Sequence, residues 1–160
     1  MKKLRTLLEG PFLTNSGYGK HCCQILRILF QDPVFDLHIC NLRWGNTPFR
    51  TEDTDETKLI HQCINKYALA EQQGQKDYDI HIQITIPNEF NRRGKVCIGV
   101  TAGAEVHKIS HVWVQKCNEF DLIIVPSQFT KNVFENTIVD WQNNQTGEKG
   151  QFRITTPVVV

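Results

Sequence analysis

The sequence predicts an α/β domain of three layers, in which a mostly parallel β-sheet lies between two layers of helices. Short apolar segments alternate along the chain with segments whose apolar residues recur at helical spacing. This alternation is typical of strands joined by helical crossovers, which make the strands parallel and cover both faces of the sheet. With 160 residues, 40% of them hydrophobic, the chain is large enough for one domain over residues 1–160.

The first strand and helix precede Asp32-Pro33. Residues 4–8, with three leucines, predict a short buried strand, and residues 10–19 contain three glycines, a proline, an asparagine and a serine, which predicts a loop. From about Lys20 a helix is expected, because apolar residues recur at helical spacing up to the Asp-Pro stop: Cys22, Cys23, Leu26, Leu29 and Phe30.

The same pattern follows twice more. Residues 35–42 predict a second strand, and the polar residues 51–57 precede a helix whose apolar face contains Leu59, Ile60, Cys63, Ile64, Tyr67 and Ala68. In the third strand, residues 79–86, isoleucines alternate with His81, Gln83 and Thr85. The alternation places the isoleucines on one face and the polar side chains on the other. Pro87-Asn88-Glu89 ends this strand.

Two further strands are predicted at residues 95–101 and 121–125, and both are expected to be central and buried. Ser110 can cap a helix between them, and Ser127 can cap a helix that follows the second. Residues 139–150 predict a polar loop, and residues 152–160 are again strand-like. This last segment either closes a sheet edge or leads into a second domain.

Composition disfavours several functional classes. The formal net charge is +1, from 18 basic and 17 acidic residues, so no basic surface for nucleic acid or anionic membranes is expected. The apolar run near the amino terminus is ended by Glu9, Gly10 and Pro11, so neither a signal peptide nor a membrane span is predicted. Six cysteines without C-x-x-C spacing indicate reduced, mostly buried thiols, as in a cytoplasmic protein.

The candidate site lies where strands end, because ligands of open parallel sheets bind beyond the carboxyl ends of the strands. After the first strand the loop contains Asn15, Ser16, Gly17, Tyr18 and Gly19. Glycines beside a helix amino terminus favour an anion such as phosphate, although a helix-entry turn without a ligand explains them equally well. Cys22 replaces the third glycine of a dinucleotide motif and His21 replaces the Ser or Thr of a P-loop, so no cofactor is predicted.

Other candidates follow the later strands. Gly103 and Glu105 come after the fourth strand, where the Glu105 carboxylate can orient a substrate hydroxyl or assist proton transfer, or simply lie at the surface. Asn88 and Glu89 form a turn that either lines the same cleft or is solvated. His107 and His111 have the spacing of a zinc pair, but a cap at Ser110 would leave only His111 on the helix, so no metal site is predicted. The fourth segment that directly follows a predicted strand is residues 126–128, which includes Ser127.

Three segments carry a resemblance to a known family: residues 10–12 with 15–19, residues 98–105, and residues 121–127 followed by Phe129. They resemble the amino-terminal, Rossmann-like domain of GT-B-fold glycosyltransferases, in the large retaining group that includes glycogen-synthase-like and mannosyltransferase-like enzymes. The resemblance spans nearly the whole chain. Its strongest element is the strand that runs into Val125-Pro126-Ser127 and a helix.

The resemblance implies a two-domain enzyme whose amino-terminal domain binds mainly the acceptor, with a nucleotide-sugar donor in the cleft between domains. On this reading Gly17 to Gly19 face the donor diphosphate or the transferred sugar, and Glu105 lies near the reacting sugar. The sequence departs from the family at Ala104-Glu105, where a His or Asp pair is common. The carboxyl-terminal donor-binding domain, with its paired glutamates, is missing from these 160 residues.

Three functional hypotheses remain. The first is a glycosyltransferase, or a fragment of one, that moves a sugar from a nucleotide-sugar donor to a glycan or other acceptor and is inactive as 160 residues alone. The second is a non-catalytic module that binds a glycan or a protein. The third is a small oxidoreductase or another nucleotide-binding α/β protein.

Overall fold

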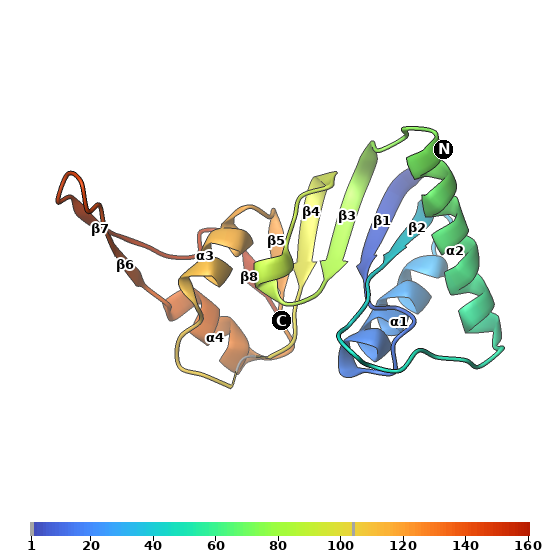
Figure 1. Ribbon diagram of the computed structural model, residues 1–160, viewed down its shortest axis with the longest axis horizontal. Coiled ribbons are helices and arrows are strands. Elements are labelled where there is room, and N and C mark those ends of the chain that lie inside the picture. Colours follow the sequence, from blue (N-terminus) through green and yellow to red (C-terminus); the bar gives the residue numbers. More distant parts are fainter. Residues whose placement is uncertain (1, 104) are drawn as a thin grey trace.

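The computed structural model describes residues 2–103 and 105–160 and confirms the α/β fold, with helices on both sides of a six-stranded parallel sheet (Figure 1). The strand order is β2-β1-β3-β4-β5-β8, and every neighbouring pair is parallel. The strands are β1 (Leu4–Gly10), β2 (Phe35–Asn41), β3 (Tyr78–Ile84), β4 (Gly94–Val100), β5 (Leu122–Ile124) and β8 (Val158–Val159).

Four α-helices and one short 3₁₀ turn connect the strands. They are α1 (Gly17–Phe30), α2 (Asp55–Gln72), η1 (Pro87–Glu89), α3 (His111–Asn118) and α4 (Gln128–Asn136). Ser110 and Ser127 cap α3 and α4, as predicted. Helix α1 begins at Gly17, three residues before the predicted start at Lys20, because the Ser16 hydroxyl accepts a hydrogen bond from the Gly19 amide and so starts the helix within the glycine loop.

Two apolar clusters lie on opposite faces of the sheet. Helices α1 and α2 pack with Leu8, Ile82 and Val100, whereas α3 and α4 pack with Cys97 and Ile123 among others. Val100 and Cys97 are an odd number of positions apart in β4, so they point to opposite faces. On the α1 face, Val100 of β4 is buried in the first cluster and Ile98 and Ile124 are partly buried against it, so this face is covered over β4 and less completely over β5 and β8. The three-layer arrangement predicted from the sequence is confirmed.

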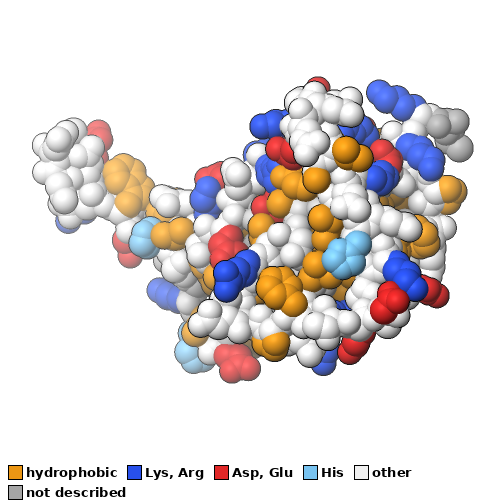
Figure 2. Space-filling model, turned by 45° about the vertical axis from the view of Figure 1, so that its right-hand side comes forward, with side chains coloured by type: hydrophobic (Ala, Val, Ile, Leu, Met, Phe, Trp, Pro, Cys, Tyr) orange, Lys and Arg blue, Asp and Glu red, His pale blue; other side chains and the backbone are white. Residues whose placement is uncertain are grey.

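The predicted polar loop at residues 139–150 is instead most of a β-hairpin. Strands β6 (Val139–Gln142) and β7 (Lys149–Phe152) pair antiparallel, and Figures 1 and 2 show the hairpin projecting from the body of the domain. Its turn is closed by hydrogen bonds from Asn143 N to the Glu148 carbonyl and from Gly147 N to the Asn143 carbonyl, both 2.8 Å. Residues 152–160 are not one strand, because only Val158–Val159 pairs with β5, at the sheet edge.

The face of β3 that contains the polar residues is buried. His81, Gln83 and Thr85 are each at most 1% exposed, because neighbouring strands and the segments over them cover this face. The alternation therefore predicted which residues share a face, and the strand register confirms it. It did not predict that the isoleucine face would be the more open one at Ile80.

The six cysteines are free thiols, and all except Cys40 are buried. Burial raises the pKa of Cys117 to about 12, so this thiol stays protonated at neutral pH. Within residues 2–103 and 105–160, no group of three His, Cys, Asp or Glu side chains could hold a metal ion. None of the helices in these ranges is both long and apolar enough to traverse a bilayer.

Candidate functional site

The carboxyl ends of β1, β3, β4 and β5 lie at one edge of the sheet, because these strands are parallel and adjacent. The segments that follow them contain every predicted site residue: Asn15, Ser16, Gly17, Tyr18, Gly19, Asn88, Glu89, Gly103, Glu105, His107 and Ser127. This edge is therefore the candidate site. Hydrogen bonds link some of these residues to one another, whereas others make no contact with the rest.

A rigid turn leads from β1 into α1. The buried Thr14 hydroxyl lies 2.9 Å from the Pro11 carbonyl oxygen and 2.8 Å from the Ser16 hydroxyl. Ser16 in turn accepts from the Gly19 amide at 3.0 Å. A side chain on Gly19 would overlap with the Thr14 carbonyl oxygen, so glycine is required for this close approach. The turn is thus held from both ends.

Gly17 is the open position of the turn. It is exposed, and a side chain added there would meet nothing within 4 Å. The amides of Gly17 and Tyr18 have no acceptor in the described part of the chain, as expected for the first turn of a helix. Free amides and the positive end of the helix dipole both favour an anion at this point.

Tyr18 ties the turn to the segment after β4. Its hydroxyl lies 3.1 Å from Thr101 Oγ1 and accepts a hydrogen bond from the Ala102 amide at 3.0 Å. Its ring lies against Trp44, with centroids 4.8 Å apart and planes inclined by 45°. The segments that follow β1, β2 and β4 therefore meet around one tyrosine.

Trp44 and Thr101 were not predicted as site residues. Trp44 lies in residues 42–54, between β2 and α2, a stretch without regular periodicity or a motif. This stretch is held beside the turn, because the Asn15 amide donates to the Pro48 carbonyl at 2.9 Å. A tryptophan in a polar loop at the carboxyl end of a strand is the one sequence signal that could have found it.

Glu105 and His107 are exposed in the segment between β4 and α3. Neither side chain makes a hydrogen bond or ion pair with another residue in the described ranges, so the structure brings neither into contact with the turn. Gly103 lies near the start of α4, since a side chain on it would come 3.3 Å from Thr130 Oγ1. Ala104, which belongs to the motif quoted above, lies outside the described residues.

Asn88 and Ser127 have structural partners. Asn88 Oδ1 accepts from Trp113 Nε1 at 3.1 Å and so links η1 to α3. Ser127 Oγ accepts from the Thr130 amide at 3.1 Å, as a helix cap. Glu89 is exposed at the same edge, and partial burial raises the pKa of its carboxyl group. Of these three side chains, only that of Glu89 has no hydrogen-bond partner among the described residues.

A buried polar cluster was also missed by the sequence reasoning. Glu9, one residue before the end of β1, lies on the sheet face opposite α1, where its Oε2 is 3.2 Å from both His81 Nε2 and Arg93 Nη1. Arg93 also donates to the Tyr67 hydroxyl at 2.8 Å and to Glu71 at 3.1 Å, which anchors α2. Two strands, one loop and one helix converge on this cluster.

The cluster shifts the ionisation of its members. Burial acts to raise the pKa of Glu9, but its contacts with His81 and then Arg93 outweigh this effect, so the pKa lies below its usual value. Burial acts to lower the pKa of His81, but the neighbouring Cys97 and Glu9 outweigh it and the pKa is raised. Both shifts favour a charged pair.

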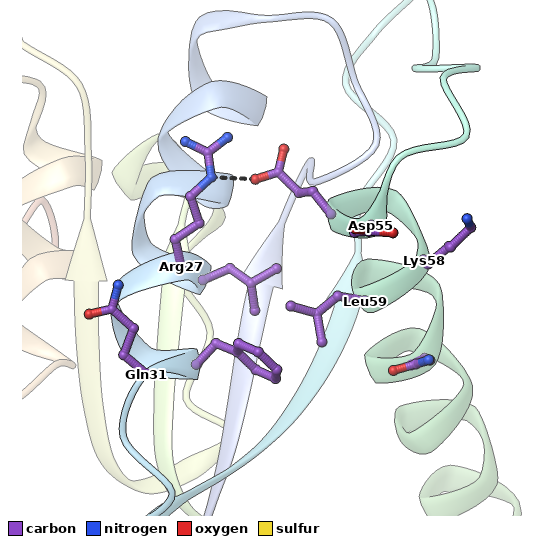
Figure 3. A pocket seen from close by; sticks show the side chains of 9 residues that line it. Arg27, Gln31, Asp55, Lys58 and Leu59 are labelled. Atoms are coloured by element: carbon purple, nitrogen blue, oxygen red, sulfur yellow. Dashed lines mark hydrogen bonds and ion pairs between the residues drawn. The ribbon is translucent and has the colours of Figure 1, made fainter.

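A separate hollow of about 630 Å³ lies between α1 and α2 (Figure 3). Its apolar lining is formed by Leu26, Phe30 and Leu59, and an ion pair between Arg27 Nε and Glu56 Oε1, 2.5 Å apart, joins the two helices beside it. None of the predicted site residues lines this hollow. It is therefore a different surface from the carboxyl edge.

The carboxyl edge can thus hold an anion at the amino terminus of α1, beside the aromatic rings of Tyr18 and Trp44. Carboxylates that could take part in proton transfer are present at the same edge, at Glu89 and Glu105. Comparisons of this chain with protein-family models, with curated proteins and with solved structures found no match.

Proposed function

We propose that this domain is the acceptor-side half of a GT-B-fold glycosyltransferase, with the diphosphate of a nucleotide-sugar donor facing the amino terminus of α1. The observation that carries the proposal is the turn before α1, in which Ser16 and Gly19 are fixed while Gly17 is open and two amides are free. The same residues, 15–19, carry the resemblance to that family.

This domain would contribute to catalysis by electrostatic stabilisation of the leaving group. Departure of the nucleoside diphosphate develops negative charge on the leaving oxygen, and fixed amides stabilise such charge without having to reorganise. The Gly17 and Tyr18 amides are held in place by the hydrogen bonds of Ser16 and Tyr18. The rings of Tyr18 and Trp44 would offer an apolar surface to a sugar ring, and Glu105 would act near the reacting sugar.

The proposal expects weak binding and no sugar transfer by these 160 residues alone. In this family the second α/β domain holds the nucleotide, so the present domain would contribute only the contacts at the diphosphate and the acceptor. A diphosphate held by a few amides at a surface is expected to bind in about the millimolar range.

The test is a titration of ¹⁵N-labelled protein with UDP-glucose, GDP-mannose and inorganic pyrophosphate, followed by amide chemical shifts. We expect shifts concentrated at residues 17–19. Gly17→Val should abolish them, because its side chain occupies the open space in front of the helix without disturbing the packing. Gln24→Val, exposed further along the same helix, is the matched control and should leave the shifts unchanged.

Absence of any shift at residues 17–19 with all three compounds would contradict the proposal, as would equal effects of Gly17→Val and Gln24→Val. If glycans without a nucleotide shift these amides while the three anions do not, the domain is instead a carbohydrate-binding module.

Where a second domain is joined to this one, Glu105→Gln should lower kcat with little change in KM for the donor.

A further inference from the structure

The hollow between α1 and α2 is one part of a longer groove. A second hollow, of about 350 Å³, adjoins the hollow of about 630 Å³ that Figure 3 shows, and both are lined by Phe30, Leu59 and Gln62. Because the two hollows share these three side chains, they form one continuous depression, which is called the α1–α2 groove below.

The interior of the α1–α2 groove is apolar. Leu26 is fully buried beneath the first hollow, and Leu37 and Cys63 are each 4% exposed beneath the second. Phe30, the last residue of α1, lies at both hollows, and its ring is 59% exposed. A phenylalanine this exposed beside a buried aliphatic floor offers apolar contact area to a ligand.

Unpaired charges lie at the two ends of the groove and have opposite signs. Asp55 lies at the first hollow and Lys3 at the second, and neither side chain forms an ion pair with another residue in the described ranges. Other charges on the walls neutralise one another in two ion pairs, Arg27 with Glu56 and Lys66 with Asp36. An elongated ligand with one anionic end would therefore place that end beside Lys3 and its uncharged part in the interior.

The length of the groove can be read from α2, which lines it from Asp55 to Lys66. At about 1.5 Å per residue, this stretch is about 16 Å long. Carbon–carbon bonds of about 1.5 Å advance an extended chain by about 1.3 Å per atom, so about 12 carbons span this length.

The shape and size of the groove favour a small molecule over a protein. Its hollows lie within or close to the range of about 300–1,000 Å³ that is usual for small-molecule sites, and apolar side chains with a few polar groups at the ends are typical of such sites. A protein partner ordinarily needs about 800 Å² of surface on each side, which a crevice between two helices does not offer.

We propose that the α1–α2 groove binds one straight-chain fatty acid of about 12 carbons, with its carboxylate beside Lys3 and its methyl end between Leu26 and Leu59. The chain is narrow enough to follow the crevice past Phe30, and every methylene group meets apolar side chains of one helix or the other. None of the predicted residues of the carboxyl edge lines this groove, so the inference stands apart from the proposed function.

The test is a series of calorimetric titrations with the saturated carboxylates from hexanoate to hexadecanoate, each below its micelle concentration. A buried methylene group strengthens binding by up to about fourfold. We therefore expect affinity to rise with each carbon up to about 12 carbons and then to level off, because longer chains extend beyond the groove. Amide shifts in ¹⁵N-labelled protein should be concentrated at Leu26, Phe30, Leu59 and Gln62.

Matched variants test the place of the chain. Gln62→Trp should weaken laurate binding at least tenfold, because its larger side chain occupies the groove, whereas His61→Trp, exposed on α2 outside the groove, should leave it unchanged. Leu59→Arg should also weaken binding at least tenfold, with Leu69→Arg, 56% exposed on the same helix, as its control. Circular dichroism checks that all four variants fold.

A third pair tests the place of the carboxylate. Lys3→Met should remove the preference for laurate over 1-dodecanol, and Lys2→Met should keep it.

Four results would overturn the proposal. They are absence of binding by every carboxylate of the series, affinity that keeps rising beyond 14 carbons, equal effects of a groove variant and its control, and tighter binding of 2-naphthoate than of laurate. The second and third would show nonspecific hydrophobic contact, and the last would make a compact aromatic molecule the occupant.

Discussion

At the scale of single residues, two tyrosine hydroxyls differ in the partners they have. The Tyr18 hydroxyl bonds to Thr101 and accepts from the Ala102 amide, whereas the buried Tyr78 hydroxyl has no partner in the described residues. Tyr18→Phe should therefore lower the free energy of unfolding by about 1–2 kcal/mol, since it removes two hydrogen bonds and leaves the amide unpaired. Tyr78→Phe should be neutral or slightly stabilising.

Urea denaturation followed by circular dichroism measures both changes. If Tyr78→Phe costs as much as Tyr18→Phe, the Tyr78 hydroxyl has a partner that the contacts above do not include. If Tyr18→Phe is neutral, the segments after β1 and β4 are not held together as described, and the site would be looser than its geometry suggests.

The Glu9–His81 pair makes stability depend on pH. The pKa of His81 is raised on folding, so its contribution is fully present below the usual histidine pKa of about 6.5 and is lost as the pH rises through the raised value. The pKa of Glu9 is lowered, so its contribution is present above about 4.3 and is lost as the pH falls through the lowered value. The pair should stabilise the fold most between about pH 4.5 and 6.5.

A double-mutant cycle with Glu9→Gln and His81→Asn tests this dependence. The coupling energy from urea denaturation should be about 1–3 kcal/mol near pH 5.5 and clearly smaller at a pH above the raised pKa of His81. Because Arg93 still pairs with Glu9 at high pH, Glu9→Gln should remain destabilising there. A coupling energy that is the same at both pH values would mean that His81 does not change its charge over this range.

The sequence could not have predicted the buried cluster, and the reason is distance along the chain. Glu9 and His81 are separated by 72 positions and Glu9 and Arg93 by 84, and only the pairing of β1 with β3 brings the first two together. Trp44 beside Tyr18 is a similar case. By contrast, the cap at Ser127 depends on an amide three residues away, so local sequence was enough to predict it.

At the scale of elements, the β6–β7 hairpin differs from the rest of the fold. It projects from the body, and an isolated two-stranded hairpin is at best marginally stable in water. Its base is anchored, because Val139 and Phe152 pack against the cluster of α3 and α4. We therefore expect the amides between Asp140 and Gln151 to open with a free energy several kcal/mol below that of β1 and β3.

Native-state hydrogen exchange measures this difference strand by strand. The expected order is slow exchange at Leu8 and Ile82 and fast exchange at Gln142 and Lys149. Protection of the hairpin equal to that of β1 would mean that it is covered by something other than its own two strands, for example by another copy of the chain. Mild proteolysis should give the same order, with the first cleavage at the hairpin turn.

The hairpin was predicted as a loop because its signals are weak. Apolar residues at Val139, Trp141 and Phe152 alternate with polar ones, but Asn, Gln, Thr and Gly dominate between them and indicate a turn. Strands β1 to β5 were found because each is an apolar or alternating segment of the expected length, and the helices because their apolar spacing is clear, whereas β8 is much shorter than the strand predicted over residues 152–160. The observed helix boundary differs from the predicted one where a side-chain cap determines it, as at the start of α1, which Ser16 caps.

At the scale of the whole molecule, the two clusters belong to one sheet. Strands β3 and β4 pair along six positions and join the half with α1 and α2 to the half with α3 and α4. Leu26→Ala in one cluster and Phe134→Ala in the other should each lower the free energy of unfolding by about 2–5 kcal/mol. Both should do so within a single transition, since neither half has a complete sheet of its own.

Circular dichroism and tryptophan fluorescence, followed in the same urea titration, check this expectation. Coincident curves for both variants support one cooperative unit. Curves that separate for Phe134→Ala alone would divide the chain into two folding units between β3 and β4. The sequence predicted parallel strands from their alternation with helices, but not their order, because nothing local specifies that β1 lies between β2 and β3.

The order of the two clusters along the chain has a consequence during synthesis. Buried members of the cluster around α1 and α2 all lie between residues 8 and 100, while most of the other cluster comes after residue 100. At about 5–20 residues per second, a ribosome needs about 3 to 12 seconds to add residues 101–160. Until α3, α4 and β8 have been added, Phe90 and Cys97 lack part of their cluster, so the nascent chain has incompletely covered apolar surface on the side that α3 and α4 later cover.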